Sequence, residues 1–284
     1  TGQEALVRAN TGTGSITQTS GSITGQTVGL LAQNVGTNTR SININADNLV
    51  VNGGGSIYVS EADSVNLIAD ITAAGSTFNQ SPLSAGGDFR VFANNNLNVN
   101  NQVQGTDVSL IANTGNLAVN QNVTATGNAV LSAGGNISGT GTVTAPNLGL
   151  DAANIGTAAN SLNIDADNLA VNADTNVFVD DTDDVTLVNS VTATAANDSV
   201  TGNTAGNDFR VEASGNITVN DAVNATDVAL VTDNGGIAVN QSVTATSDAV
   251  LNASGDITGN GTVTAPNLGL DAANIGTVAN PLNI

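Results

Sequence analysis

Residues 141–157 read GTVTAPNLGLDAANIGT, and the same letters return at residues 261–277, which begin 120 positions later. Other segments repeat at the same distance, as when DFRV at 88–91 returns at 208–211. A repeat at a fixed distance sets the fold, so it has to be interpreted before any single motif. We therefore expect a 120-residue unit, present a little over twice. Its boundaries are placed at 1–26 (partial), 27–146, 147–266 and 267–284 (partial).

A shorter period of about 20 residues runs inside this unit, as Ile217, Ile237 and Ile257 show. Apolar and polar residues alternate in each coil, which is typical of strands with one buried face. A coil of strands joined by Gly- and Asn-rich corners is one turn of a parallel β-helix, whose turns bury their apolar faces only by stacking. The sequence predicts an all-β parallel β-helix (solenoid) with about 20 residues per rung and six rungs per repeat. We expect one continuous solenoid over 1–284.

The composition narrows the function classes. The chain has 24 acidic and 4 basic residues and a net charge of −20. Nucleic acids and anionic membrane surfaces are bound through basic patches, so neither is an expected partner. Cys and His are absent, which removes thiolate and imidazole metal sites. No apolar run approaches the length of a membrane helix, and we expect no membrane insertion.

One irregular rung occurs in each copy, at 68–87 and 188–207. Its first strand is short, at Ile71 and Ala73 in one copy and at Val191 and Ala193 in the other, and loops follow at 75–87 and 195–207. Variable loops on a constant scaffold are where solenoids often bind partners. The alternative is a solvated excursion without a role. The candidate partner-binding residues of these loops are Phe78, Asn79, Pro82, Asn197 and Asp198.

The densest acidic cluster is DDTDD at 180–184, which we place at a corner between Val179 and Val185. Carboxylates are the ligands that Ca²⁺ prefers. The matching corner at 60–64 carries half the charge, and the calcium-binding nonapeptide of β-rolls is missing, so a solvated corner is the competing interpretation. No cofactor other than calcium is expected. Its candidate ligands are Asp180, Asp181, Asp183 and Asp184.

Catalysis is not expected. Without His, Cys or Lys, only carboxylate-based glycoside chemistry remains as an alternative. Arg90 and Arg210 follow Phe89 and Phe209, which we place in the core, and we expect the two arginines to pair with Asp88 and Asp208. Outward threonines suggest ice binding as a further alternative, but Gln104 and Asn224 interrupt their ladder; the threonines are Thr24, Thr124, Thr144, Thr244 and Thr264.

Four segments carry a family likeness: GTVTA at 261–265, LGLDA at 268–272, NIGT at 274–277 and NPLNI at 280–284. In these segments the chain resembles the repeat regions of filamentous-haemagglutinin-like exoproteins. Those proteins are the large secreted partners of two-partner secretion systems in Gram-negative bacteria. The resemblance implies a right-handed parallel β-helix, secretion to the cell surface, and a role as an adhesin shaft or surface fibre.

The function expected from these observations is structural: an extracellular solenoid segment that spaces or scaffolds and associates with itself, end to end or side by side. The alternative from another class is a ligand-binding adhesin module, which would recognise a host-cell receptor or glycan through the loops of the irregular rungs.

Overall fold

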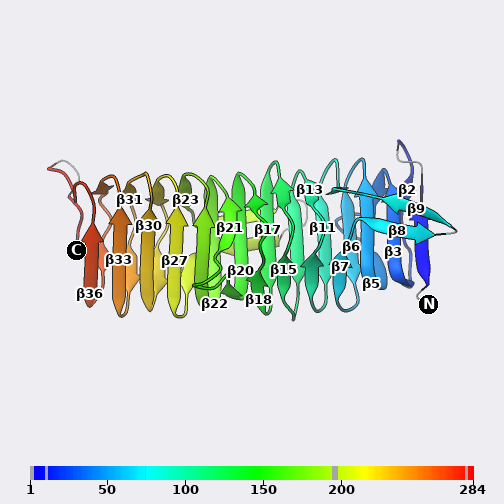
Figure 1. The fold of residues 1–284 in the computed structure, drawn as a ribbon, viewed down its shortest axis with the longest axis horizontal. Helices are drawn as coiled ribbons and strands as arrows, with labels where there is room; N and C mark the ends of the chain where they lie inside the picture. The colour runs from blue at the N-terminus through cyan, green and yellow to red at the C-terminus, as the bar shows by residue number, and fades with distance from the viewer. Residues whose placement is uncertain (1–2, 10–11, 74, 194–197, 279–280) are drawn as a thin grey trace. The chain divides into compact units, whose positions relative to one another are not determined.

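The computed structural model consists of strands joined by tight turns (Figure 1). The residues that it describes are 3–9, 12–73, 75–193, 198–278 and 281–284. The chain forms a parallel β-solenoid of about 13 turns with about 20 residues per turn, as the sequence predicted. None of the described residues belongs to a helix that is long and apolar enough to cross a membrane.

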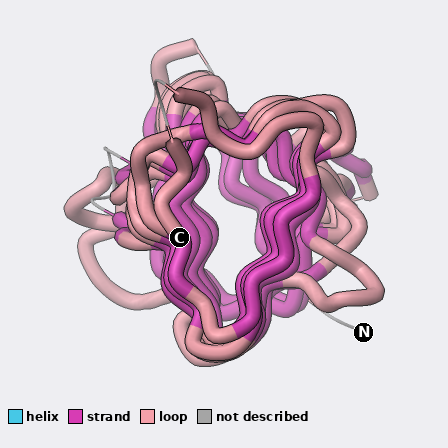
Figure 2. Tube along the Cα trace, turned by 90° about the vertical axis from the view of Figure 1, so that its left-hand side faces the viewer, coloured by secondary structure: helices cyan, strands magenta, loops and turns pink. Residues whose placement is uncertain are grey.

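The chain divides into two compact units. The first contains residues 1–142 together with 193–198, and the second contains 143–192 together with 199–284. Strands alternate with loops around each coil, so the loops form the corners (Figure 2). The handedness, the six-rung repeat and the continuity of the solenoid over 1–284 stay predictions.

Most strands of the first unit are short and pair in parallel with strands one turn away. They are β1 (Glu4–Arg8), β2 (Ser15–Ile16), β3 (Ile23–Ala32), β4 (Asn34–Val35), β5 (Ile42–Gly53), β6 (Ile57–Glu61), β7 (Val65–Leu67), β8 (Asp70–Ala73), β9 (Ser76–Asn79), β10 (Leu83–Ser84), β11 (Phe89–Ala93), β12 (Leu97–Val99), β13 (Val103–Gly105), β14 (Val108–Ala112), β15 (Leu117–Val119), β16 (Val123–Ala125), β17 (Asn128–Ala133) and β18 (Asn136–Ser138).

The strands that follow along the chain repeat this pattern. They are β19 (Val143–Thr144), β20 (Asn147–Ile155), β21 (Leu162–Asp165), β22 (Asn168–Asp181), β23 (Val185–Leu187), β24 (Ser190–Ala193), β25 (Asp198–Thr201), β26 (Asn203–Ala205), β27 (Asp208–Ala213), β28 (Ile217–Val219), β29 (Val223–Ala225), β30 (Asp227–Thr232), β31 (Ile237–Val239), β32 (Val243–Ala245), β33 (Asp248–Ala253), β34 (Ile257–Thr258), β35 (Val263–Thr264) and β36 (Asn267–Asp271).

The core is made of apolar ladders that run from turn to turn. Ile217 of β28 lies in register with Ile237 of β31, which in turn lies in register with Ile257 of β34. Phe89 and Phe209 are buried, as the alternation predicted. Because successive side chains of a strand point to opposite faces, the residues between the buried ones face outward.

The corners are held by ladders of side-chain amides. Oδ1 of Asn96 accepts a hydrogen bond from the backbone N–H of Asn116 at 2.8 Å, and Oδ1 of Asn116 accepts one from the N–H of Asn136 at 2.8 Å. A corner leaves backbone donors without a strand partner, and these amides satisfy them. The abundance of Asn at these positions is therefore structural.

The irregular rung of the first unit contains a feature that the sequence did not predict. β8 coincides with the short strand predicted at Ile71 and Ala73, but it forms an antiparallel hairpin with β9, which lies where a loop was expected. Ile57 of β6 pairs with Phe89 of β11, a step of 32 residues, whereas the usual step is about 20. The hairpin therefore occupies the extra residues between β7 and β10 without disturbing the stacking of the rungs.

Gly139 offers a test of how tightly the turns approach one another. Its φ of +142° is rare for residues with a side chain, and a Cβ there would overlap the carbonyl oxygen of Val119. Gly139→Ala is expected to lower the free energy of unfolding by about 2–4 kcal/mol. Gly21 is the control, because its φ is +81° and nothing lies within 4 Å of an added Cβ.

Gly21→Ala should cost only about 1 kcal/mol, the penalty of the left-handed backbone alone. Urea denaturation followed by circular dichroism measures both changes. Equal costs for the two substitutions would show that the turns are not in the close contact described here.

Candidate functional site

The β8–β9 hairpin lies on the outer surface of its own unit. Its strands run across β3 and β1 and extend past β1 (Figure 1). Ile71 of β8 is buried, and its side chain lies over Gly29, where an added Cβ would meet Ile71 Cδ1 at 2.9 Å. β8 is thus packed against the rungs, whereas in the loop predicted at 75–87 residues 75–77, Asn79, Ser81 and Gly86 are exposed.

The candidate partner-binding residues of this rung take up different positions. Phe78 lies opposite Ile71 in the hairpin, and the guanidinium of Arg8 stands 4.7 Å from the centre of its ring. Asn79 is exposed and donates a hydrogen bond to Asp70 at 2.5 Å, while Pro82 lies between β9 and β10. Only Phe78 combines an apolar surface with a neighbouring charge.

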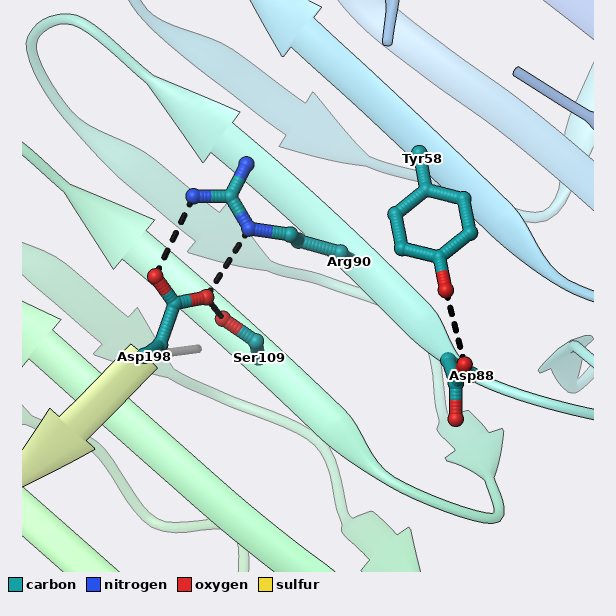
Figure 3. Close-up of polar contacts among 5 residues, drawn as sticks. All are labelled: Tyr58, Asp88, Arg90, Ser109 and Asp198. Atoms are coloured by element: carbon teal, nitrogen blue, oxygen red, sulfur yellow. Dashed lines mark hydrogen bonds and ion pairs between the residues drawn. The ribbon is translucent and has the colours of Figure 1, made fainter. Parts of the chain in front are cut away.

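In the second irregular rung, Asn197 lies outside the described residues, and Asp198 is described. Asp198 belongs to the first unit, where it forms an ion pair with Arg90. Nε of Arg90 donates to Oδ2 of Asp198 at 2.8 Å, and one terminal nitrogen donates to Oδ1 at 3.2 Å (Figure 3). The hydroxyl of Ser109 donates to the same carboxylate. Asp198 is therefore held by three donors from two neighbouring strands, β11 and β14.

The expected pairing of each arginine with the aspartate two residues before it is wrong. Arg90 pairs with Asp198, and Arg210 pairs with Glu212. Asp88 instead accepts a hydrogen bond from the hydroxyl of Tyr58 at 2.7 Å (Figure 3). Burial, the hydrogen bond to Asp88 and the charge of Asp88 together raise the pKa of Tyr58 to about 12.

The corresponding surface of the second unit is open. A groove of about 340 Å³ is lined by Phe178, Asp208, Arg210, Asp227, Ala229, Asp248 and Val250, among others. Val250 is 45% exposed, whereas Val130, which lies 120 residues earlier, is only 1% exposed. The same position of the repeat is thus covered in one unit and uncovered in the other.

Two carboxylates point into the protein at equivalent places of the repeat. Glu61 is 1% exposed, and its oxygens accept hydrogen bonds from the backbone N–H groups of Ala46 at 3.0 Å and Ala62 at 2.8 Å. Asp181 is likewise buried and accepts from Ala166 at 3.1 Å. Burial raises the pKa of Glu61 to about 7, although the backbone donors favour the charged form and offset part of the rise.

The side chains of the four candidate calcium ligands do not converge on one point. Asp181 ends strand β22 and points inward, which corrects its assignment to a corner, and burial raises its pKa. Asp184 accepts hydrogen bonds from the backbone and side chain of Asn216 at 2.6 and 3.1 Å. Asp183 donates its backbone N–H to Asp181 at 3.0 Å.

Asp180, the remaining candidate, also lies on β22 and pairs in register with Glu212 of β27. Burial raises the pKa of Asp180, and the charge of Glu212 adds to the rise. Within the part of the chain that the structure describes, no three acidic groups gather as they would around a metal ion.

The chemistry that this arrangement offers is recognition. The outward residues of β11 and β14 present an arginine and a hydroxyl to the carboxylate of Asp198. A planar guanidinium that donates two hydrogen bonds to one carboxylate fixes the orientation of that carboxylate as well as its position.

Comparisons of this chain with protein-family models, with curated proteins and with solved structures gave no match. No relative suggests a role for any residue named above. The geometry of these faces and hairpins therefore carries the functional argument.

Glu61 should make the stability of the first unit depend on pH. A carboxyl whose pKa is about 7 when folded and 4.5 when unfolded contributes stability below pH 4.5 that is lost as the pH rises through 7. The loss is about 3 kcal/mol for a shift of this size. Glu61→Gln resembles the protonated acid and should flatten this part of the profile.

Urea denaturation at several values between pH 4 and pH 8 measures the difference. The exposed Glu4 lies in the same unit, so Glu4→Gln is the matched control and should run parallel to the parent. Parallel profiles for Glu61→Gln and the parent would mean that the backbone donors outweigh the cost of burial.

A double-mutant cycle tests the ion pair between Arg90 and Asp198. The two side chains are only 20% and 15% exposed, so their coupling energy should be about 1–3 kcal/mol, from Arg90→Gln and Asp198→Asn. The more exposed pair of Arg210 and Glu212 serves as the control, and we expect about 0.5 kcal/mol or less there. Coupling as weak at Arg90 as at Arg210 would contradict the geometry of the site.

Proposed function

We propose that this chain is a structural segment of a fibre or shaft, part of a large bacterial protein that is secreted or held at the cell surface. The single observation that carries the proposal is the regular parallel stacking of about 13 turns of about 20 residues. Such an array gains length without changing its cross-section, because each turn contacts only its neighbours. Length and stiffness are the properties that a spacer requires.

The distribution of polar groups supports the same function. Several outward asparagines are hydrogen-bonded to the neighbouring turn, as when Asn120 donates to Asn100 at 2.8 Å and Asn240 to Asn220 at 2.9 Å. These ladders stiffen the array and fix its register. Because these side-chain amides are hydrogen-bonded to one another, they are not available to bind a ligand.

The resemblance of residues 261–284 to the repeats of filamentous-haemagglutinin-like exoproteins supports a place outside the cell. The absence of Cys suits a chain that crosses an envelope unfolded, because no disulfide can form in it before export. We propose that the segment reaches the surface of a Gram-negative cell by two-partner secretion and associates there with copies of itself.

Immunogold labelling of intact cells that produce this chain tests the proposal. An antibody raised against the 284-residue chain should label structures outside the cell without permeabilisation. An antibody against a cytoplasmic protein should label only permeabilised cells, which controls for leakage. Labelling with the first antibody that also requires permeabilisation would contradict the proposed function.

A further inference from the structure

Asparagine is followed directly by glycine at three places in the sequence, 52–53, 234–235 and 260–261. An asparagine in such a pair loses its side-chain amide readily, because glycine has no Cβ to hinder the approach of its main-chain nitrogen to the asparagine Cγ. The reaction consumes only water. The three pairs lie in different surroundings, and these surroundings decide which of them can react in the folded chain.

The pair at 234–235 lies at the corner between β30 and β31. Asp233 and Asn234 are exposed, so solvent reaches this corner. Gly235 is buried, and its main-chain N–H has no hydrogen-bond partner among the described residues. Buried main-chain donors are nearly always paired, so this one is an exception. Attack by this nitrogen therefore breaks no hydrogen bond of its own and removes an unpaired donor.

The other two pairs are held by the main chain. The N–H of Gly261 donates to the carbonyl oxygen of Val239 at 2.8 Å, and this bond has to break before the nitrogen can reach Cγ of Asn260. Residues 52 and 53 end strand β5 and pair in register with β3, so their backbone is held extended. Both pairs should therefore react more slowly than the pair at 234–235.

The first copy of the repeat carries a residue at this corner that cannot react. Thr114, which lies 120 positions before Asn234, donates its hydroxyl to the carbonyl oxygen of Asn94 at 2.7 Å. Asn234 makes the equivalent contact with its amide, because Nδ2 donates to the carbonyl oxygen of Ser214 at 3.3 Å. The corner thus requires a donor at this position, and a hydroxyl supplies it as well as an amide does.

We propose that Asn234 is a site of spontaneous deamidation in the folded protein. The main-chain nitrogen of Gly235 loses its proton to hydroxide and attacks Cγ of Asn234. The new N–Cγ bond closes a succinimide ring, the Cγ–Nδ2 bond breaks, and Nδ2 takes up a proton and leaves as ammonia.

Water then opens the ring at one of its two carbonyl carbons. Cleavage of the N–Cγ bond gives aspartate, and cleavage of the bond between the nitrogen and the main-chain carbonyl carbon of Asn234 gives isoaspartate. One water is consumed and one ammonia is released for each asparagine, and nothing is oxidised or reduced. The site does not depend on the proposed fibre function.

The products change the corner in two ways. A carboxylate at position 234 cannot donate to Ser214, and it adds a negative charge next to Asp233. Isoaspartate also adds a carbon to the main chain where there is little room, because even a Cβ on Gly235 would overlap the carbonyl oxygen of Gly215. The modified second unit should therefore be less stable than the original.

Incubation of the folded chain in warm, mildly alkaline heavy-oxygen water, followed by peptide mapping with mass spectrometry, tests the site. The heavy oxygen marks the amides lost during incubation, and an isoaspartate-specific methyltransferase labels the isoaspartate. Asn234 should convert roughly tenfold faster than Asn260, the factor that corresponds to breaking one hydrogen bond. The rate at Asn234 should rise with pH, because the attacking nitrogen has to lose its proton.

The repeat itself supplies the matched variants. Asn234→Thr copies Thr114 of the first copy and should abolish the modification at this corner while keeping the fold. Asn260→Thr copies Thr140 and should leave conversion at Asn234 unchanged. After the incubation, the thermal midpoints of the parent and of Asn260→Thr should have fallen, and that of Asn234→Thr should be preserved.

The chain denatured in urea gives the reference rates. There the three pairs should convert at similar rates, because each asparagine precedes a glycine. Conversion in the folded chain that is as fast at Asn52 or Asn260 as at Asn234 would overturn the proposal. An Asn234 that stays intact in the folded chain, while the denatured chain reacts at the same position, would overturn it as well.

Discussion

A coil of about 20 residues cannot shield its own apolar side chains from water, and the rest of this structure depends on that constraint. Val, Ile and Leu of one turn are buried only when the next turn lies directly above and below them. Parallel strand pairing supplies the backbone hydrogen bonds and fixes the register in the same step, so an inward residue meets another inward residue. The outward residues are left free to differ between copies.

The irregular rungs are the places where additional segments pack on the outer surface of the coils. A hairpin inserted between two halves of a rung leaves the stack undisturbed, because the extra 12 residues (32 minus 20) lie outside the coil. The β8–β9 hairpin then buries Ile71 against outward positions such as Gly29. Asp198 likewise lies on the outward face of β11, where it forms an ion pair with Arg90.

The sequence was sufficient to predict the fold, because the period of 20 and the alternation within it are global patterns. The inward positions of Phe89, Phe209 and Ile217 follow from strand alternation alone. The same parity places Glu61 and Asp181 inside, two residues after the buried Val59 and Val179, so the buried acids could have been found by following the alternation through the acidic segment.

Periodic patterns of this kind do not predict contacts between side chains on the surface. Arg90 and Asp198 are 108 residues apart and share no periodic relation, so the sequence favoured the nearby Asp88 as a partner. The short strand at Ile71 and Ala73 was predicted, but its partner β9 was missed because its residues, STFN, lack the apolar alternation of the rungs. Which parts of the outer face are covered depends on where the hairpins lie, and that is set by packing between distant turns.

The central claim is that these turns serve as a length of fibre in an assembly larger than one chain. Cryo-electron microscopy of material taken directly from producing cells tests it most directly. The account predicts filaments in which strands stack at about 4.8 Å along the filament axis and continue far beyond the turns of a single chain. Separate particles that each contain one solenoid of about 13 turns would contradict it.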